Sequence, residues 1–228
     1  MPLPSPPDQA GSLAGLPGRA LRASRLFRVW RHDLPGGASR STPWWFASAN
    51  ADETGGGRFD LPEPMGTCYF GTRPESALLE ALQARLVNLP REELTVRRMA
   101  RVTVPAEAPD AAMLTARRVA GEFGITAELW AGGNRALTRR WAGAIRRDGW
   151  WAIYAGVAHD PSGRLRAVAL FDHAGEHAPT VGGRWRWTSR RLDADDDLER
   201  ALQRFGVTVR EPGRLRWAKP PGNAPRSS

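Results

Sequence analysis

Three polar residues stand eleven positions apart in the first half of the chain: Arg58, Tyr69 and Glu80. Arg58 follows a run of three glycines that ends at Gly57. Glycine lets the backbone approach a ligand closely, and a guanidinium group binds phosphate through paired hydrogen bonds that lysine cannot form. The pattern is suited to binding a pyrophosphate, with a phenol and a carboxylate further along the chain.

Each of these residues also has an ordinary structural explanation. A triple glycine before arginine is common in surface turns and fits neither the P-loop nor the dinucleotide fingerprint. Tyr69 lies beside Phe70 in an apolar run, so it is either a core aromatic or a residue that stacks on a ligand. Glu80 lies opposite Leu78 and Leu82 on a helical wheel, where solvated glutamates and cleft residues are both found. Residue spacing leaves these alternatives open.

Short apolar and aromatic runs predict the strands that position these residues, at 26–30, 67–70, 101–104 and 167–171. A helix is expected to begin at Thr72, because Thr72 and Glu75 have capping-box spacing and Pro74 lies in the first turn. Further helices are expected over residues 135–147 and 195–205. Because strands and helices do not alternate regularly, the sequence predicts a mixed α+β fold rather than a doubly wound parallel sheet.

The chain has 228 residues, of which 41% are hydrophobic, and this is enough for one sizeable core. Residues 1–23 and 211–228 are rich in small residues and proline, so we expect both tails to lack a fixed conformation. The folded domain then spans residues 24–210. The net charge is +9, to which residues 1–25 contribute +2 and the basic tail 211–228 contributes +3. A basic composition concentrated at the ends is weak evidence for nucleic-acid binding.

Composition also disfavours several classes of protein. Cys68 is the one cysteine in the sequence, which excludes an intrachain disulfide and a thiolate zinc cluster, and its apolar neighbours predict a buried side chain. His173 and His177 are separated by glycine after a strand, which argues against a helical metal pair, so no metal is expected. No run approaches the roughly 20 apolar residues of a membrane span, and no signal peptide is recognised. We therefore expect a cytoplasmic protein without membrane contact.

Two further segments have competing interpretations. His159 and Asp160 begin a segment that is typical of a turn between strands, although they fall near the candidate site. Residues 184–191 combine two tryptophans with several arginines, a composition found on base-stacking surfaces. No nucleic-acid-binding motif accompanies them, and tryptophans of this kind more often anchor a core. Direct nucleic-acid binding is the least favoured function.

An ordered set of short motifs resembles the RES domain family, whose members bind and break down NAD. The set comprises Phe27-Arg28, Gly57-Arg58-Phe59, Tyr69, Ala77-Leu78 followed by Glu80, and Ala169-Leu170-Phe171. The likeness spans roughly residues 26–172, and the combination is far more specific than any single piece. It implies a mixed, partly split β-sheet with flanking helices, related to the ADP-ribosyltransferase or diphtheria-toxin-like fold.

The resemblance also implies roles for individual residues. Arg28 and Arg58, with Gly57, would hold the phosphates and ribose of NAD, while Tyr69 and Glu80 would lie near the nicotinamide riboside. Family members cleave the bond to nicotinamide with inorganic phosphate as acceptor in the studied cases, so a phosphorylase or a glycohydrolase is the leading interpretation. The catalytic residues implied are Arg58, Tyr69 and Glu80, with Arg28 assisting, and a carboxylate such as Glu80 can stabilise the oxocarbenium-like sugar of that reaction. The family further implies a DNA-binding antitoxin as protein partner, and a homo-oligomer is left open.

One departure from the family pattern concerns the segment 152–157. Family members often have Gly-Ile-x-Tyr-x-Ser there, whereas this chain has Ala-Ile-Tyr-Ala-Gly-Val, so that Val157 takes the place of the serine. A lost hydroxyl removes one hydrogen-bond donor from the expected pocket. The alternative function is therefore an NAD-binding relative with impaired catalysis.

Overall fold

The computed structural model describes residues 2–82 and 89–210, and the expected C-terminal tail 211–228 lies outside the described residues. Eight strands form the main sheet, in the order β1 (Gly18–Arg19), β6 (Ala111–Met113), β7 (Ala152–Gly156), β8 (Arg166–His173), β3 (Met65–Gly71), β2 (Arg25–Arg31), β5 (Arg97–Thr103) and β9 (Arg186–Arg191). A separate parallel pair joins β4 (Leu89–Pro90) to β10 (Val209–Arg210). The helices are α1 (Pro74–Leu82), α2 (Arg91–Thr95), α3 (Arg117–Phe123), α4 (Glu128–Ala131), α5 (Arg135–Arg147) and α6 (Asp196–Phe205), with 3-10 turns at Pro35–Gly37 and Leu192–Ala194.

The main sheet is split between β3 and β2. These neighbours pair at one described position, Phe27 opposite Gly71, whereas β3 pairs with β8 and β2 pairs with β5 over seven residues each. On the side of β3 that faces β2, Thr67 instead pairs with Ala47 of the preceding loop. These two residues exchange backbone hydrogen bonds of 2.8 and 3.0 Å. The expected mixed α+β fold with a partly split sheet is confirmed.

Most elements predicted around the candidate site are present. The four predicted strands correspond to β2, β3, β5 and β8, and two of the predicted helices correspond to α5 and α6. The helix expected from Thr72 begins two residues later, at Pro74. The Thr72 hydroxyl instead donates to the carbonyl of Arg166 in β8, 3.2 Å away. Thr72 therefore ties the start of the helix to the sheet.

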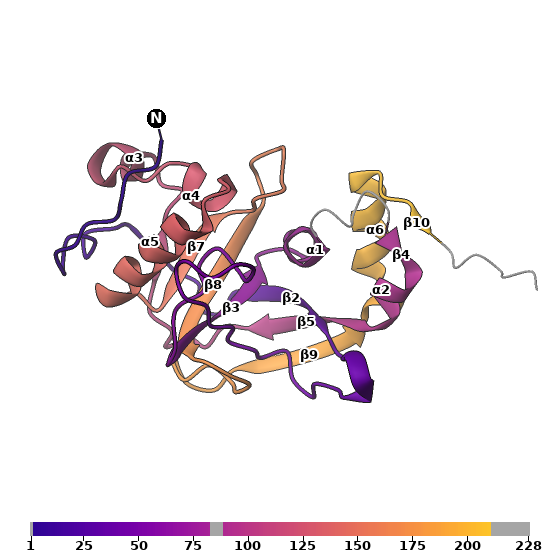
Figure 1. The fold of residues 1–228 in the computed structure, drawn as a ribbon. Helices are drawn as coiled ribbons and strands as arrows, with labels where there is room; N and C mark the ends of the chain where they lie inside the picture. The colour runs from indigo at the N-terminus through magenta and orange to yellow at the C-terminus, as the bar shows by residue number, and fades with distance from the viewer. Residues whose placement is uncertain (1, 83–88, 211–228) are drawn as a thin grey trace, which may run out of the picture.

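The helices form two groups over the sheet (Figure 1). In the first group, α5 buries Trp141, Ala142 and Ile145 in a core cluster that includes Ile153 of β7 and Phe171 of β8. In the second group, α1, α2 and α6 share a core cluster with β2 and β5. In the view of Figure 1, α1 is the member of this group nearest to the first group.

Gly71 of β3 is the point at which α1 rests on the sheet. A Cβ atom at this position would lie 2.3 Å from the backbone nitrogen of Ala77 and 2.6 Å from the Cβ of Ser76. The first turn of α1 therefore packs directly against strand backbone. This contact sets the height of the helix, and of Glu80 in its second turn, above the sheet.

The N-terminal segment differs from its expected lack of structure. Leu3, Leu13 and Leu16 are buried in the cluster beneath α5, and the Asp148 carboxylate accepts hydrogen bonds from the backbone N–H groups of Gly11 (2.8 Å) and Leu13 (2.6 Å). A chain that crosses a core without repeating structure needs only occasional apolar residues, so its leucines show neither helical nor strand periodicity. For this reason the sequence pattern concealed the packing of residues 2–23.

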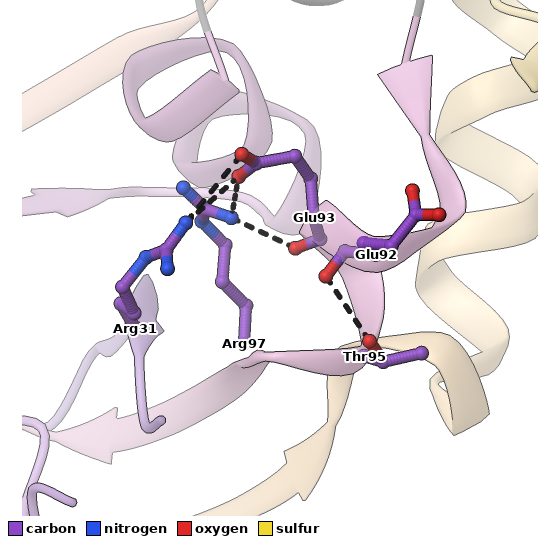
Figure 2. Close-up of polar contacts among 5 residues, drawn as sticks. All are labelled: Arg31, Glu92, Glu93, Thr95 and Arg97. Carbon is purple, nitrogen blue, oxygen red and sulfur yellow. Dashed lines mark hydrogen bonds and ion pairs between the residues drawn. The ribbon is translucent and has the colours of Figure 1, made fainter. Parts of the chain in front are cut away.

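An ion cluster ties α2 to strands β2 and β5 (Figure 2). The Glu93 carboxylate accepts hydrogen bonds from Arg97 of β5 and, at 3.4 Å, from Arg31 of β2. Arg97 is buried and also donates to the Glu93 carbonyl at 2.8 Å. Because a buried guanidinium needs acceptors for its N–H groups, this cluster fixes α2 against the two strands.

Candidate active site

A cavity of about 160 Å³ opens at the split in the sheet. Its walls come from β2, β3, β7 and β8, from α1, and from the N-terminal end of α5. The residues singled out from the sequence all line it, namely Arg28, Gly57, Arg58, Tyr69 and Glu80. Strand β2, the loop before β3, strand β3 and helix α1 therefore each bring one polar side chain to the same cavity.

Glu80 projects from α1 into this cavity as a half-buried carboxyl group. Burial raises its pKa, while a hydrogen bond from the backbone N–H of Ala158 and the positive charges of Arg58 and Arg135 act in the opposite direction. A carboxylate in this setting lies near cations and a backbone donor and is only partly open to water. Its negative charge can consequently act on a ligand with little solvent screening.

Hydrogen bonds hold Arg58 against α5 and against Gly132, which precedes that helix. Its guanidinium donates to the carbonyl of Gly132, and its own carbonyl accepts a 2.7 Å hydrogen bond from the Thr138 hydroxyl. Burial, followed by the charge of Arg135, lowers the pKa of Arg58, and Glu80 raises it. Two guanidinium groups near one carboxylate leave a positive excess that suits an anionic ligand.

The Tyr69 hydroxyl is already engaged within the protein. It donates to Asp60 Oδ1 at 2.7 Å and accepts from the backbone N–H of Phe59 at 2.9 Å. Burial, followed by the charge of Asp60, raises the pKa of Tyr69 well above its usual value. The aromatic ring is consequently the part of Tyr69 that is available to a ligand in the cavity.

Gly57 owes its identity to this arrangement. A Cβ atom at position 57 would lie 2.2 Å from the Tyr69 hydroxyl and 2.6 Å from Asp60 Oδ1. The backbone N–H of Gly57 donates to Asp60 Oδ2 at 2.6 Å. Because any side chain would enter the Tyr69–Asp60 pair, the glycine permits the close packing that places Arg58 at the cavity wall.

Arg28 of β2 also lines the cavity. Its guanidinium contacts the thiol of the buried Cys68, donates to the carbonyl of Trp45 at 3.4 Å, and stands 5.7 Å from the centre of the Phe70 ring. Burial, followed by the charge of Arg40, lowers the pKa of Arg28 to about 10. Arg28 thus stays charged at neutral pH.

Sequence reasoning missed several residues that shape the site. Arg135 lines the cavity and acts electrostatically on Arg58, Glu80 and His159. A sequence signal for Arg135 was available in Asn134, a residue type that commonly caps helices. The Asn134 side chain caps α5 by accepting from the Leu137 N–H at 3.0 Å, which makes Arg135 the first residue of the helix. The further residues are Asp60, Trp130, Arg139 and His159.

The segment that contains His159 is a turn, as predicted, but His159 is also part of the cavity wall. Asp160 holds the turn by accepting hydrogen bonds from the N–H groups of Ser162 (3.0 Å) and Leu165 (2.6 Å). Burial, followed by the charges of Arg58 and Arg135, lowers the pKa of His159. The predicted turn is confirmed, and it also presents the imidazole of His159 at the cavity.

Val157, which takes the place of the family's serine, was expected in the pocket but is not among the residues that line the cavity. Its side chain is buried against Leu79 and Ala167, and it borders a separate surface hollow. The neighbouring Ala158 lines the cavity and supplies the N–H donor to Glu80. A serine hydroxyl at position 157 would thus point into an apolar cluster.

The tryptophans of the Trp-Arg segment serve the core. Trp185 is buried and packs against Trp44 and Trp151, with ring centres 5.8 and 6.2 Å apart. Cys68 is buried, as predicted. Residues 2–82 and 89–210 contain no cluster of three or more His, Cys, Asp or Glu side chains arranged to hold a metal ion. In that same part of the chain, every helix falls short of the length and apolar character of a membrane span.

Fold and cavity together define a mixed α+β protein with a small-molecule cavity at a split in its sheet. Residues 25–191 match the model of the RES domain, and the chain belongs to the RES domain family. A comparison with curated proteins gave no match. Among solved structures, a chain from the M. tuberculosis MbcT–MbcA toxin–antitoxin complex is similar over 75% of this chain and 85% of that chain, with 11% identity and a TM-score of 0.47.

Proposed function

We propose that this protein is an NAD-consuming enzyme that cleaves the bond between nicotinamide and ribose. Membership of the RES family supports this proposal. The observation that carries it is the position of Glu80, a half-buried carboxyl group in a cavity that it shares with Arg58 and Arg135. The substrate has the complementary charges, a cationic nicotinamide ring and an anionic pyrophosphate.

The proposed reaction needs a carboxylate close to the nicotinamide riboside. When the C–N bond breaks, its electron pair goes to the ring nitrogen, and neutral nicotinamide leaves an oxocarbenium-like ribose. Glu80 stabilises that positive charge, while an oxygen of inorganic phosphate or of water bonds to the ribose carbon. Phosphate yields ADP-ribose that carries the phosphate on that carbon, as in an NAD phosphorylase, whereas water loses a proton to solvent and yields ADP-ribose, as in a glycohydrolase.

The size of the cavity limits how the dinucleotide lies. Its volume of about 160 Å³ is below the roughly 300–1,000 Å³ of typical ligand sites. The nicotinamide riboside would occupy the enclosed part, near Glu80 and the ring of Tyr69. Arg58 and Arg28 then remain for the phosphates and ribose, since a guanidinium forms charge-assisted bonds with phosphate oxygens.

Mass spectrometry of the products tests this proposal. Purified protein is incubated with NAD, with and without inorganic phosphate, and nicotinamide, ADP-ribose and its phosphorylated form are quantified. Phosphate-dependent release of nicotinamide identifies a phosphorylase, and phosphate-independent release identifies a glycohydrolase. Tight NAD binding without turnover would select the binding-only alternative, and neither binding nor turnover would reject both.

We also propose that the protein is the toxin of a toxin–antitoxin pair, with a separate DNA-binding antitoxin that covers the cavity. Family membership supports this proposal. Induced expression should arrest growth, and Glu80→Ala should relieve the arrest. A candidate antitoxin from an adjacent reading frame should protect cells and block NAD loss in vitro. If Glu80→Ala arrests growth as strongly as the unmodified protein, toxicity does not arise from this site.

A further inference from the structure

The side chain of Arg139 holds together the loop that leads into the cavity. Arg139 lies one helical turn after Arg135 in α5 and is 2% exposed. Its guanidinium donates to four backbone carbonyls of that loop, those of Asn50 (2.8 Å), Glu53 (2.7 Å), Gly57 (3.1 Å) and Gly55. One side chain therefore gathers residues 50–57 around a single point.

This role requires arginine. The planar guanidinium group carries five N–H donors in a fixed fork and no acceptor, which matches several carbonyls converging from different directions. A lysine places three donors on one atom and cannot span the same set. Asn50, Glu53 and Gly55 are themselves exposed, so hydrogen bonds to the buried Arg139, and not packing of their own side chains, hold this part of the loop.

The glycines of the loop make room for the guanidinium group. Gly56 has φ +66°, and a Cβ atom there would lie 2.8 Å from both Arg139 Nη2 and Asp60 Oδ2. Arg139 and Asp60 thus approach the loop from the same side at this position. A larger residue at position 56 would separate the loop from both anchors.

The same anchors fix the backbone immediately before Arg58. Asp60 accepts from the N–H of Gly57 at 2.6 Å, whereas Arg139 donates to the Gly57 carbonyl. The next carbonyl, that of Arg58, accepts from Thr138 at 2.7 Å. Neighbouring residues 138 and 139 of α5 therefore determine where the Arg58 side chain leaves the loop.

We infer that Arg139 is a positioning residue that holds the loop 50–57 so that Arg58 faces Glu80 across the cavity. Arg139 does not line the cavity and acts through Arg58. The consequence for substrate binding rests on the proposed function, whereas the consequence for the loop does not. Sites of this kind depend on supporting residues that keep the binding side chain in its productive geometry.

Two measurements on Arg139→Lys test the inference, with Arg140→Lys, an exposed neighbour on the same helix, as the matched control. Hydrogen exchange should be at least tenfold faster for the hydrogen-bonded amides of Asn50, Glu53 and Gly57 in Arg139→Lys, and unchanged in the control. The KM for NAD should rise at least tenfold with kcat altered less than threefold, because Arg58 contacts a part of NAD that does not react. Unchanged exchange in the loop would overturn the inference.

A double-mutant cycle separates positioning from a general loss of stability. If Arg139 acts through Arg58, Arg139→Lys should change NAD affinity less than threefold when Arg58 is already alanine. Full additivity of the two changes would contradict the inference. If the unmodified protein neither binds nor consumes NAD, the proposed function fails, and the hydrogen-exchange result still decides the claim about the loop.

A second variant guards against misfolding of Arg139→Lys. Gly56→Ala keeps Arg139 intact but separates it from the loop, so it should reproduce both the faster exchange and the higher KM. Gly36→Ala is the matched control, because Gly36 also has positive φ (+83°) and has open space around its Cβ position. Equal effects of Gly56→Ala and Gly36→Ala on the loop and on KM would show that the anchoring contact is unimportant.

Discussion

The hydroxyl group of Tyr69 donates a 2.7 Å hydrogen bond to the carboxylate of Asp60, which is itself 1% exposed. Tyr69 lines the candidate cavity, and Asp60 holds the N–H of Gly57. The pair therefore connects the aromatic wall of the cavity to the glycine-rich loop. Because the Tyr69 hydroxyl is used in hydrogen bonds within the protein, we expect the aromatic ring to be the part that contacts a ligand.

Tyr69→Phe should destabilise the fold more than it weakens NAD binding. The change leaves the N–H of Phe59 without its acceptor and Asp60 Oδ1 without its donor, at a cost of about 1–3 kcal/mol in the free energy of unfolding. The ring remains, so NAD affinity should fall less than in Tyr69→Ala. Denaturant unfolding and calorimetry measure the two effects. Tyr154→Phe, at the only other tyrosine in the sequence, is the control.

Glu80→Gln should reduce the rate of nicotinamide release by roughly 10²–10³-fold, the usual effect of removing one electrostatic contact to a transition state. The amide keeps the shape of the side chain and can still accept from Ala158, so NAD binding should change little. Glu75→Gln is the matched control, because Glu75 lies on the same helix but pairs with Arg204. Near-normal release by Glu80→Gln would assign the catalytic charge to another group.

The activity should depend on pH through Glu80. Because burial raises the pKa of this carboxyl group, it retains its proton at pH values where an ordinary glutamate, with a pKa of about 4.3, is ionised. The reaction needs the carboxylate, so kcat/KM should fall as the pH drops through the raised pKa. A pH–rate profile should place the acidic limb above the ordinary glutamate value. An acidic limb at or below that value would argue against the role.

The raised pKa of Glu80 should also make the free energy of unfolding depend on pH. A carboxyl group whose pKa is raised by folding stabilises the fold below its unfolded pKa, and this contribution is lost as the pH rises through the folded pKa. At neutral pH the ionised Glu80 therefore costs stability, and Glu80→Gln should raise Tm. The increase should shrink below about pH 4.

Val157→Ser should lower stability without improving activity. Val157 is buried against Leu79 and Ala167, and a hydroxyl without a partner there should cost about 1–3 kcal/mol. Val157→Ala removes the same methyl groups without adding a hydroxyl, and the difference between the two variants isolates the polar penalty. Activity that increases in Val157→Ser would show that the family serine does reach the substrate.

Local sequence patterns predicted the elements that carry the site. The apolar runs around Leu26 and Cys68 identified β2 and β3, and the apolar stripe around Trp141 identified α5. The meeting of Arg58, Tyr69 and Glu80 at one cavity came from the family likeness, because an interval of eleven residues has no geometric meaning across a loop, a strand and a helix. Only the combined motif linked them.

Other parts of the site left no readable pattern. Arg139 bonds to backbone carbonyls of residues more than 80 positions away, and a carbonyl is present at every residue regardless of type. Asp60 looked like an ordinary polar residue after a glycine run, since nothing local indicated its burial. Such contacts depend on tertiary structure, which single-sequence periodicity does not encode.

The close packing at Gly71 links a strand position to the acid nine residues later. A methyl group at 71 would collide with the backbone of Ala77, and the helix would have to lift as a rigid rod that carries Glu80 with it. The distance between the carboxylate and Arg58 would change although neither had been replaced. A substitution at Gly71 can therefore inactivate the protein although this residue contributes only backbone that supports α1.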